Sequence, residues 1–476
     1  MCYTEENERI KNMKQNLIYI FADQLRFSSV GYNGDTQART PNIDAFAKKS
    51  TILDNAVSGH PVCAPYRASL LTGKYTTSTG MVINEIRISQ NHITFPNVLR
   101  NAGYETCYIG KWHLWANVWG DHFNPDNSYI PEGQRLGFDD FFAGFNFHHD
   151  YYSPLAYYHL NSKDKIYYDG YEPDCQTDMA IEHLTRLSNN NKPFALFLSL
   201  GTPHDPWIKE NVPEKYYEMF RHTPFPNPEN YLPDNDPYAD DWAKLSEKER
   251  EELESWRQVY YAMVANLDDN FGRLTEAIEK LGLFENSIVI FTSDHGQLFG
   301  AHGRRAKNIF YDEAVRVPFL ICGKQFAPCF SDVNFNTVDI MPTLLSYLDL
   351  PIPETVEGLD KKDEIEGIAI SDEGSLMMGT GPTATYGNGH EWRGYRTKQY
   401  TYAIFKKDEK EFLFDNLYDP YQMTNLAEIP MFDEIKTRLR WEMFEKMNEI
   451  NDKFRENTYY RDHWIENRII KDVLIP

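Results

Sequence analysis

The chain has 476 residues, of which 48 are Lys or Arg and 71 are Asp or Glu, giving a formal net charge of −23. Hydrophobic residues make up 41% and aromatic residues 14%, which supplies a large core and excludes disorder for the chain as a whole. Because this negative charge repels phosphate backbones and anionic lipids, the composition argues against nucleic acid and membrane surfaces as partners.

The sequence carries no targeting or spanning signal. The acidic segment from Met1 to Glu6 lacks the apolar stretch of a secretory signal. No run of residues approaches the apolar length needed to span a bilayer. As written, the protein is therefore expected to be cytoplasmic, or periplasmic or secreted if a leader has been removed.

Apolar runs followed by polar residues recur up to about residue 350 and predict the strands of a mostly parallel sheet. The first runs from Leu17 to Ala22 and ends in Asp23 and Gln24. Further runs lie at residues 106–109, 193–200, 287–292 and 317–321. Between them, residues 249–281 repeat apolar positions at three- and four-residue steps, which predicts one long helix. This alternation predicts an α/β fold with helices on both faces of the sheet and polar sites at the carboxyl ends of its strands.

The pattern changes beyond residue 350, where short strand-like runs precede an amphipathic helix near residues 432–450. The runs lie at residues 383–386, 395–396, 401–405 and 411–414. They predict a smaller C-terminal α+β subdomain at residues 360–476, with an antiparallel sheet, after a catalytic domain at 14–355. Residues 115–175 are rich in Tyr, His, Asn and Asp with little periodicity, and are expected to form a long loop insertion.

The most informative segment is Cys63-Ala64-Pro65-Tyr66-Arg67, followed by Ala-Ser-Leu-Leu-Thr-Gly at residues 68–73. This Cys-x-Pro-x-Arg pattern resembles the signature of the type I sulfatases. Five further segments resemble motifs of that family in the same order. They are Phe21-Ala22-Asp23-Gln24, Gly110-Lys111-Trp112-His113, Thr202-Pro203-His204-Asp205-Pro206, Thr292-Ser293-Asp294-His295-Gly296, and Lys307 with the Phe310–Pro318 segment. The resemblance covers nearly the whole chain and implies an alkaline-phosphatase-like fold.

The resemblance also implies a mechanism for hydrolysing sulfate esters. A maturase would oxidise Cys63 to formylglycine (3-oxoalanine), whose hydrated aldehyde attacks sulfur. The implied catalytic residues are Cys63, Arg67, Lys111, His113, His204 and Lys307. His204 and Lys307 would assist the leaving oxygen, and His113 would take the proton from the second hydroxyl so that sulfate is expelled.

The same pattern implies a calcium ion. Its expected ligands are Asp23, Gln24, Cys63 in its oxidised form, Asp294 and His295. Oxygen ligands at strand ends suit a hard divalent cation such as Ca²⁺. Gln24 departs from the family, because many members carry a second Asp at that position.

A small sulfated carbohydrate is the expected substrate, because aromatic and polar residues gather near the motifs. Aromatic rings suit the apolar faces of sugars, and charged or amide groups suit their hydroxyls. The expected substrate-binding residues are Arg87, His149, Asp205, Trp207, His390 and Arg393, with Trp115, Trp119, His148, Tyr151 and Tyr152 as neighbours. Two alternatives stay open: a phosphonate or phosphate ester hydrolase on the same scaffold, and a non-catalytic binder of sulfated ligands whose Cys63 is never matured.

Overall fold

The computed structural model describes residues 14–84, 86–116, 128–146, 148–152, 154–190, 192–466 and 469–470. Trp119, which is expected near the substrate, lies outside the described residues. So does the acidic N-terminal segment from Met1 to Glu6. No helix within the described ranges is long and apolar enough to cross a bilayer.

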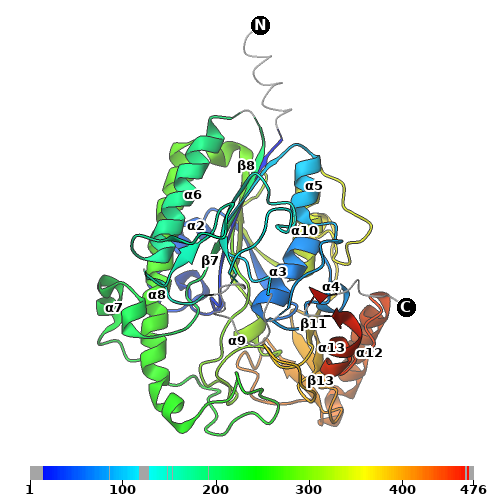
Figure 1. The fold of residues 1–476 in the computed structure, drawn as a ribbon. Helices are drawn as coiled ribbons and strands as arrows, with labels where there is room; N and C mark the ends of the chain where they lie inside the picture. Colours follow the sequence, from blue (N-terminus) through cyan, green and yellow to red (C-terminus); the bar gives the residue numbers. More distant parts are fainter. Residues whose placement is uncertain are drawn as a thin grey trace.

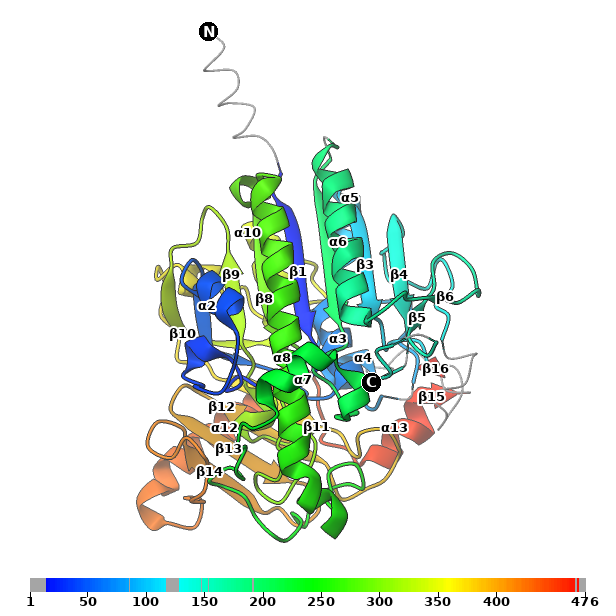
Figure 2. The ribbon, with the colours of Figure 1, turned by 90° about the vertical axis from the view of Figure 1, so that its left-hand side faces the viewer.

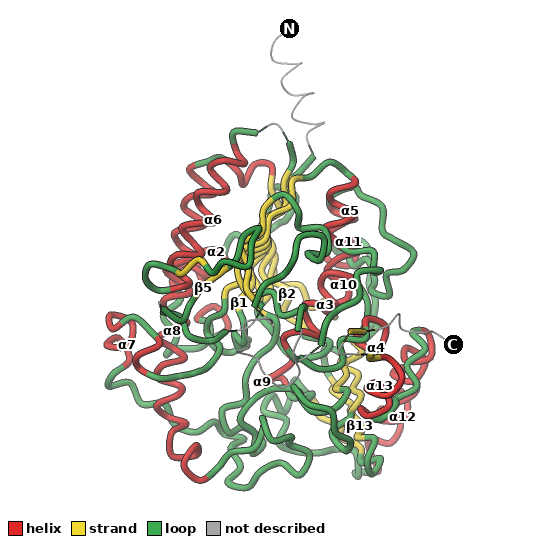
Figure 3. Tube along the Cα trace, in the orientation of Figure 1, coloured by secondary structure: helices red, strands yellow, loops and turns green. Residues whose placement is uncertain are grey.

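An eight-stranded sheet forms the centre of the larger unit (Figures 1 and 3). Its strands, in spatial order, are β10 (Cys329–Asn336), β2 (Thr51–Val57), β9 (Phe319–Cys322), β8 (Ser287–Ser293), β1 (Asn16–Ala22), β7 (Phe194–Leu200), β3 (Glu105–Lys111) and β4 (Phe141–Phe145). Only β9 runs antiparallel to its neighbours. All seven residues of β1, of β7 and of β8 are buried, as expected for central strands covered on both faces.

Helices cover both faces of this sheet. On one face lie α2 (Pro41–Ala47), α6 (Glu172–Ser188), α7 (Glu214–Phe220) and α8 (Glu247–Lys280), and on the other α3 (Cys63–Thr72), α5 (Phe95–Asn101) and α10 (Thr337–Tyr347) (Figure 1). Alternate residues of β1 enter the two cores: Ile18 and Ile20 pack on one face, Tyr19 and Phe21 on the other. The predicted long helix is α8, which begins at a capping box formed by Ser246 and Glu249.

A second, four-stranded antiparallel sheet lies below the carboxyl edge of the first (Figure 2). Its strands are β11 (Ser375–Gly379), β12 (Trp392–Arg396), β13 (Tyr400–Phe405) and β14 (Glu411–Asp415). Helices α12 (Asp433–Glu449) and α13 (Asn457–Trp464) follow it. The short elements are α4 (Thr76–Thr79), α9 (Asp312–Val315), α11 (Lys362–Ile365), β5 (Tyr157–Tyr158), β6 (Ile166–Tyr167), β15 (Ile465–Glu466) and β16 (Ile469–Ile470). The predicted fold class is thus confirmed, while the domain boundaries at 14–355 and 360–476 stay a prediction.

Two details differ from the sequence-based expectation. Residues 383–386 form bends rather than a strand, and the first strand of the small sheet is β11 instead. Residues 115–175 are not all loop, because β4 pairs with β3 at the edge of the large sheet. The segment that forms β4, Phe-Phe-Ala-Gly-Phe, is a short continuous apolar run like those of the other buried strands, but it stands within a segment rich in Tyr, His, Asn and Asp, whose composition indicates loop.

Candidate active site

Two neighbouring strands deliver two carboxylates to one place. Asp23 directly follows β1 and Asp294 directly follows β8, and these parallel strands pair in register up to Ala22 opposite Ser293. Both carboxylates are fully buried. The backbone N–H of Gln24 donates to Asp294 Oδ1 at 2.9 Å, which locks the two strand ends together. The site therefore lies at the carboxyl edge of the sheet, where ligand sites of α/β folds occur.

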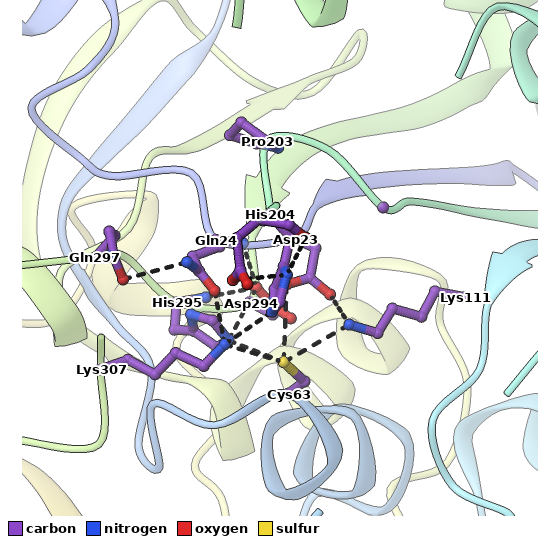
Figure 4. Close-up of polar contacts among 12 residues, drawn as sticks. Asp23, Gln24, Cys63, Lys111, Pro203, His204, Asp294, His295, Gln297 and Lys307 are labelled. Carbon is purple, nitrogen blue, oxygen red and sulfur yellow. Dashed lines mark hydrogen bonds and ion pairs between the residues drawn. The ribbon is translucent and has the colours of Figure 1, made fainter. Parts of the chain in front are cut away.

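Cys63 is the first residue of α3 and points at these strand ends (Figure 4). Its Sγ lies 3.7 Å from Asp23 Oδ1 and 3.2 Å from His295 Nε2. Ligand atoms of Asp23, Cys63, Asp294 and His295 all lie within 4.8 Å of one another. Residues from three separate segments thus form one buried cluster with the spacing of a metal site.

Two cations hold Asp23. Lys111 Nζ lies 2.6 Å from Asp23 Oδ2, and Arg67 Nη2 lies 3.1 Å from the same oxygen and 3.6 Å from Asp294 Oδ2. Burial alone would raise the pKa of Asp23, but Lys111, His204 and Arg67 together hold it well below its usual range. Burial and the neighbouring Asp23 instead raise the pKa of Asp294 to about 7. Asp23 therefore loses its proton at a lower pH than Asp294 does.

The cluster fits a hard cation. Asp294 Oδ2 is buried and accepts no hydrogen bond, so it has a lone pair to offer a ligand. His295 Nδ1 lies 3.1 Å from the Gly296 carbonyl, which can only accept, so neutral His295 presents its Nε2 lone pair to the cluster. Burial and Lys307 lower the pKa of His295 well below its usual range, which keeps the ring neutral. Carboxylate oxygens of this kind suit Ca²⁺, although a histidine ligand is unusual for it.

Gln24 is placed differently from the other expected metal ligands. Its Oε1 accepts from Lys307 Nζ at 2.6 Å, and its Nε2 donates to Gln297 Oε1 at 3.2 Å. Lys307 Nζ also lies 3.6 Å from Cys63 Sγ and 3.1 Å from His204 Nε2. Gln24 therefore positions an ammonium beside Cys63.

His204 lies on the segment that follows β7 and faces the same cluster, 4.0 Å from Asp23 Oδ1. Burial and Lys307 lower its pKa well below the usual range. The His149 ring stacks on the His204 ring with centroids 4.3 Å apart, and Tyr151 Oη donates to the Gly201 carbonyl at 2.6 Å. These contacts fix the orientation of His204 above Cys63.

A pocket opens above Cys63. Its lining residues are Gln24, Cys63, Asn84, His113, His149, His204, Asp205, Trp207, Trp242, Gln297, Arg305, Ala306, Lys307, Thr383 and Ala384. The expected residues His113, His149, Asp205 and Trp207 are thus brought to one place. Trp207 is 5% exposed, and its ring packs against Phe299 and Trp256, so it contributes mainly to the pocket wall.

Three expected substrate-binding residues are not among this lining. Arg393 is fully buried in the small subdomain, where its guanidinium pairs with Asp452 at 3.0 Å, and this contact does not favour the prediction that Arg393 binds substrate. His390 Nδ1 is 2.9 Å from the Tyr238 carbonyl. The Arg87 guanidinium lies over the Trp115 ring, 3.8 Å from its centre.

Sequence reasoning missed seven residues of the pocket wall, of which Asn84, Trp242, Gln297 and Arg305 have the larger side chains. Gln297 could have been predicted, because it lies only three residues after Asp294, which belongs to a recognised motif. Asn84 Oδ1 accepts from the backbone N–H of Ala64 at 3.0 Å, at the start of α3. Trp242 and Arg305 lie on loops outside any motif, and only the folded chain shows that they meet the pocket.

A mixed, mostly parallel sheet with a buried carboxylate and cysteine cluster at its carboxyl edge defines an alkaline-phosphatase-like hydrolase. Residues 15–350 match the family model described as Sulfatase. The ulvan-active sulfatase of Formosa agariphila is 36% identical over 456 residues, which cover 94% of this chain and 84% of that protein. The endo-4-O-sulfatase of Bacteroides thetaiotaomicron is 28% identical over 516 residues, covering 96% and 94%.

Solved structures agree with this assignment. The crystal structure of yidJ from Bacteroides fragilis superposes with a TM-score of 0.81 at 29% identity, covering 94% of this chain and 97% of that one. The chain therefore belongs to the type I sulfatase family. It is a sulfuric ester hydrolase, as the motifs predicted.

Proposed function

We propose that this enzyme releases sulfate from sulfated glycans, using formylglycine made from Cys63 and a calcium ion held beside it. The observation that carries the proposal is the cluster of Asp23, Cys63, Asp294 and His295 at the base of the pocket. Lys111, Lys307 and Arg67 surround this cluster in a chain whose net charge is −23. Such a local concentration of cations attracts an anion that the rest of the surface repels.

The surroundings of Cys63 argue against its direct use as a thiolate. Burial and Asp23 raise the pKa of its thiol to about 11, so the protein groups around it keep it protonated near neutral pH. A protonated thiol is a poor nucleophile. Formylglycine, formed by a maturase that recognises the Cys-x-Pro-x-Arg segment, would supply a hydrated aldehyde as nucleophile.

Asp23, Asp294 and His295, together with residue 63, would hold the calcium ion, because their ligand atoms already converge. The ion would supply positive charge against the oxygens of the bound sulfate ester. Arg67 is a positioning residue: besides the two carboxylates, its Nη1 donates to Ser199 Oγ at 2.6 Å and to the Lys111 carbonyl at 2.9 Å. It thereby ties the ends of β1, β8, β7 and β3 together beneath the cluster.

Proton transfers fall to groups on the pocket side of residue 63. Lys307 and His204, whose Nζ and Nε2 atoms are 3.1 Å apart, would hold a proton for the departing sugar oxygen. Lys111 Nζ, 3.8 Å from Cys63 Sγ, would bind a sulfate oxygen. His113 also lines the pocket and would act as the base that releases sulfate from residue 63.

A glycan substrate is supported by the relatives and by the pocket wall. Names of similar proteins include an ulvan-active sulfatase, an endo-4-O-sulfatase and an N-acetylglucosamine-6-O-sulfatase, although an arylsulfatase and a choline-sulfatase are also similar. The wall combines aromatic Trp242 and Trp207 with polar His149, Asp205 and Arg305. Such a mixture suits a sugar better than a purely aromatic ester or a quaternary ammonium compound.

Sulfate release tests this function directly. The protein is co-expressed with a maturase and incubated with ulvan, chondroitin 4-sulfate, N-acetylglucosamine 6-sulfate, choline sulfate, 4-nitrophenyl sulfate and a phenyl phosphonate ester. We expect sulfate from at least one glycan, with kcat/KM above that for choline and nitrophenyl sulfate. Cys63→Ala, co-expressed identically, is the inactive control. Faster hydrolysis of the phosphonate, or turnover of the aryl ester with no sugar accepted, contradicts the proposal.

A further inference from the structure

Arg305 is held in a fixed orientation at the pocket wall. Its Nη1 donates to Glu249 Oε1 at 2.6 Å, and Glu249 is itself fixed in the capping box that starts α8. Its guanidinium carbon lies 5.3 Å from the centre of the Trp256 ring. The side chain remains 29% exposed. A guanidinium held by a carboxylate and an aromatic ring loses little further entropy on binding a ligand.

The Arg305 guanidinium also faces a second carboxylate, to which it makes no hydrogen bond. Nη2 lies 4.0 Å from Asp205 Oδ2, beyond hydrogen-bond distance. The other oxygen of Asp205 lies 3.1 Å from His204 Nδ1, so Asp205 joins the wall to the catalytic histidine. A donor and an acceptor at this separation can together bind two neighbouring hydroxyl groups, one accepting from Arg305 and one donating to Asp205.

The backbone around Trp242 is attached to the same wall. Arg305 N–H donates to the Ala243 carbonyl at 2.7 Å. Asp240 accepts from the backbone N–H of Ala243 at 3.0 Å and from that of Thr383 at 2.6 Å. These hydrogen bonds hold the segment in place. The Trp242 side chain that it carries is 45% exposed and lines the pocket. An exposed ring beside polar groups is suited to stacking on the apolar face of a pyranose.

The charge balance of the wall decides which sugar groups it can bind. Arg305 contributes one positive charge, but Glu249 and Asp205 flank it, so this part of the wall has no surplus positive charge. A carboxylate or second sulfate on the sugar would meet those two acids. Neutral hydroxyls meet no such repulsion.

We propose that Arg305 and Asp205 bind adjacent hydroxyl groups of the pyranose that carries the sulfate, with Trp242 stacking on its ring. This subsite rests on the proposed glycan sulfatase function and deepens it: the subsite selects a monosulfated sugar with a free vicinal diol. Arg305 is a specificity-determining residue, since it lies on the wall and not among the groups around residue 63.

The test compares kcat/KM for monosulfated galactose, glucose and N-acetylglucosamine with kcat/KM for 4-nitrophenyl sulfate, which has no hydroxyls. Arg305→Ala is expected to lower the sugar-to-aryl ratio at least about tenfold, mainly through KM, because it removes a charge-assisted hydrogen bond. Trp242→Ala should lower the same ratio, and it serves as a second variant if Arg305→Ala folds poorly. Arg221→Ala, which removes an exposed arginine paired with Glu218, is the matched control and should leave the ratio unchanged.

Each outcome bears on the proposal. Equal losses on sugar and aryl substrates in both variants, or no loss, would overturn the subsite while leaving the glycan function standing. So would a disulfated pyranose that outperforms its monosulfated parent and loses that advantage in Arg305→Ala, because it would show an anion site. A wild-type enzyme that hydrolyses 4-nitrophenyl sulfate but no sugar sulfate would overturn the glycan function itself, and the subsite with it.

Discussion

The ammonium of Lys307 lies 2.6 Å from the amide oxygen of Gln24, and Gln297 accepts from the amide nitrogen of the same Gln24 side chain (Figure 4). Gln297 thereby fixes which end of the amide faces Lys307. A carboxylate at position 24 could not donate to Gln297, so the amide of Gln24 makes a contact that an acid at this position could not make. The pair directs Lys307 toward Cys63 and His204.

Replacing Lys307 with Ala should lower kcat most for substrates with poor leaving groups. A general acid contributes about 10²- to 10⁴-fold when the departing oxygen is strongly basic, as in a sugar. The expected loss is roughly 10²-fold or more on a sugar sulfate and smaller on 4-nitrophenyl sulfate. Steady-state kinetics on both substrates checks this, with exposed Lys398→Ala as control. Equal losses on both esters would show that Lys307 binds sulfate and does not assist departure.

Asp23→Ala should destabilise the metal-free protein by about 3–5 kcal/mol, because it leaves Lys111 and Arg67 buried without their shared carboxylate. Denaturant unfolding in the presence of a chelator measures this free energy separately from calcium binding. Asp332→Ala removes the partner of exposed Lys398 and should cost no more than about 1 kcal/mol. Similar costs for the two variants would contradict the buried network.

Calcium should stabilise the wild-type protein and not Asp294→Ala. At a concentration 100 times the dissociation constant, a ligand that binds only the folded state adds about 2.7 kcal/mol of stability. Thermal unfolding with and without calcium, after treatment with a chelator, measures the shift. Stabilisation by zinc but not by calcium, or an equal shift in Asp294→Ala, would contradict the assigned site.

The metal-free protein should lose stability between about pH 4 and pH 7 through Asp294. Its folded pKa is raised from 3.8 to about 7, so the folded state holds a proton that the unfolded state has already released. Stability from this group is therefore present at low pH and is lost as pH rises through the folded pKa. Asp23, whose pKa is lowered, stays ionised throughout this window. Melting temperatures in a chelator should fall less steeply with pH in Asp294→Asn; an identical slope would refute the assignment.

Arg393→Met should reduce stability without changing substrate preference. Arg393 and Asp452 are a fully buried pair that joins β12 to the segment before α13, so removing one partner should cost about 3–5 kcal/mol. Unfolding measurements give this cost, and sugar-to-aryl kcat/KM ratios on the folded variant should match wild type. A selective loss of sugar turnover would show that Arg393 contributes to substrate binding.

The two carboxylates of the cluster were predictable because both follow apolar runs, whereas Cys63 was identified through the resemblance of its Cys-x-Pro-x-Arg segment to the sulfatases. Asp23 and Asp294 come directly after buried strands, and parallel neighbours end at one edge, so their meeting follows from topology. The buried pairing of Arg393 could not be predicted, because its partner Asp452 lies 59 residues further along the chain and has no local signal. Trp242 and Arg305 could not be predicted for a related reason. A backbone hydrogen bond joins the two loops that carry them, and neither loop has a periodic sequence pattern that would indicate this contact.

Mass spectrometry of the peptide that contains residue 63, taken from protein that is releasing sulfate, shows directly whether Cys63 has become the formylglycine nucleophile. If formylglycine is the nucleophile, residue 63 carries an aldehyde, and the fraction converted rises in proportion to specific activity across preparations with differing amounts of maturase. Full activity in protein whose Cys63 is an unmodified thiol would contradict this mechanism.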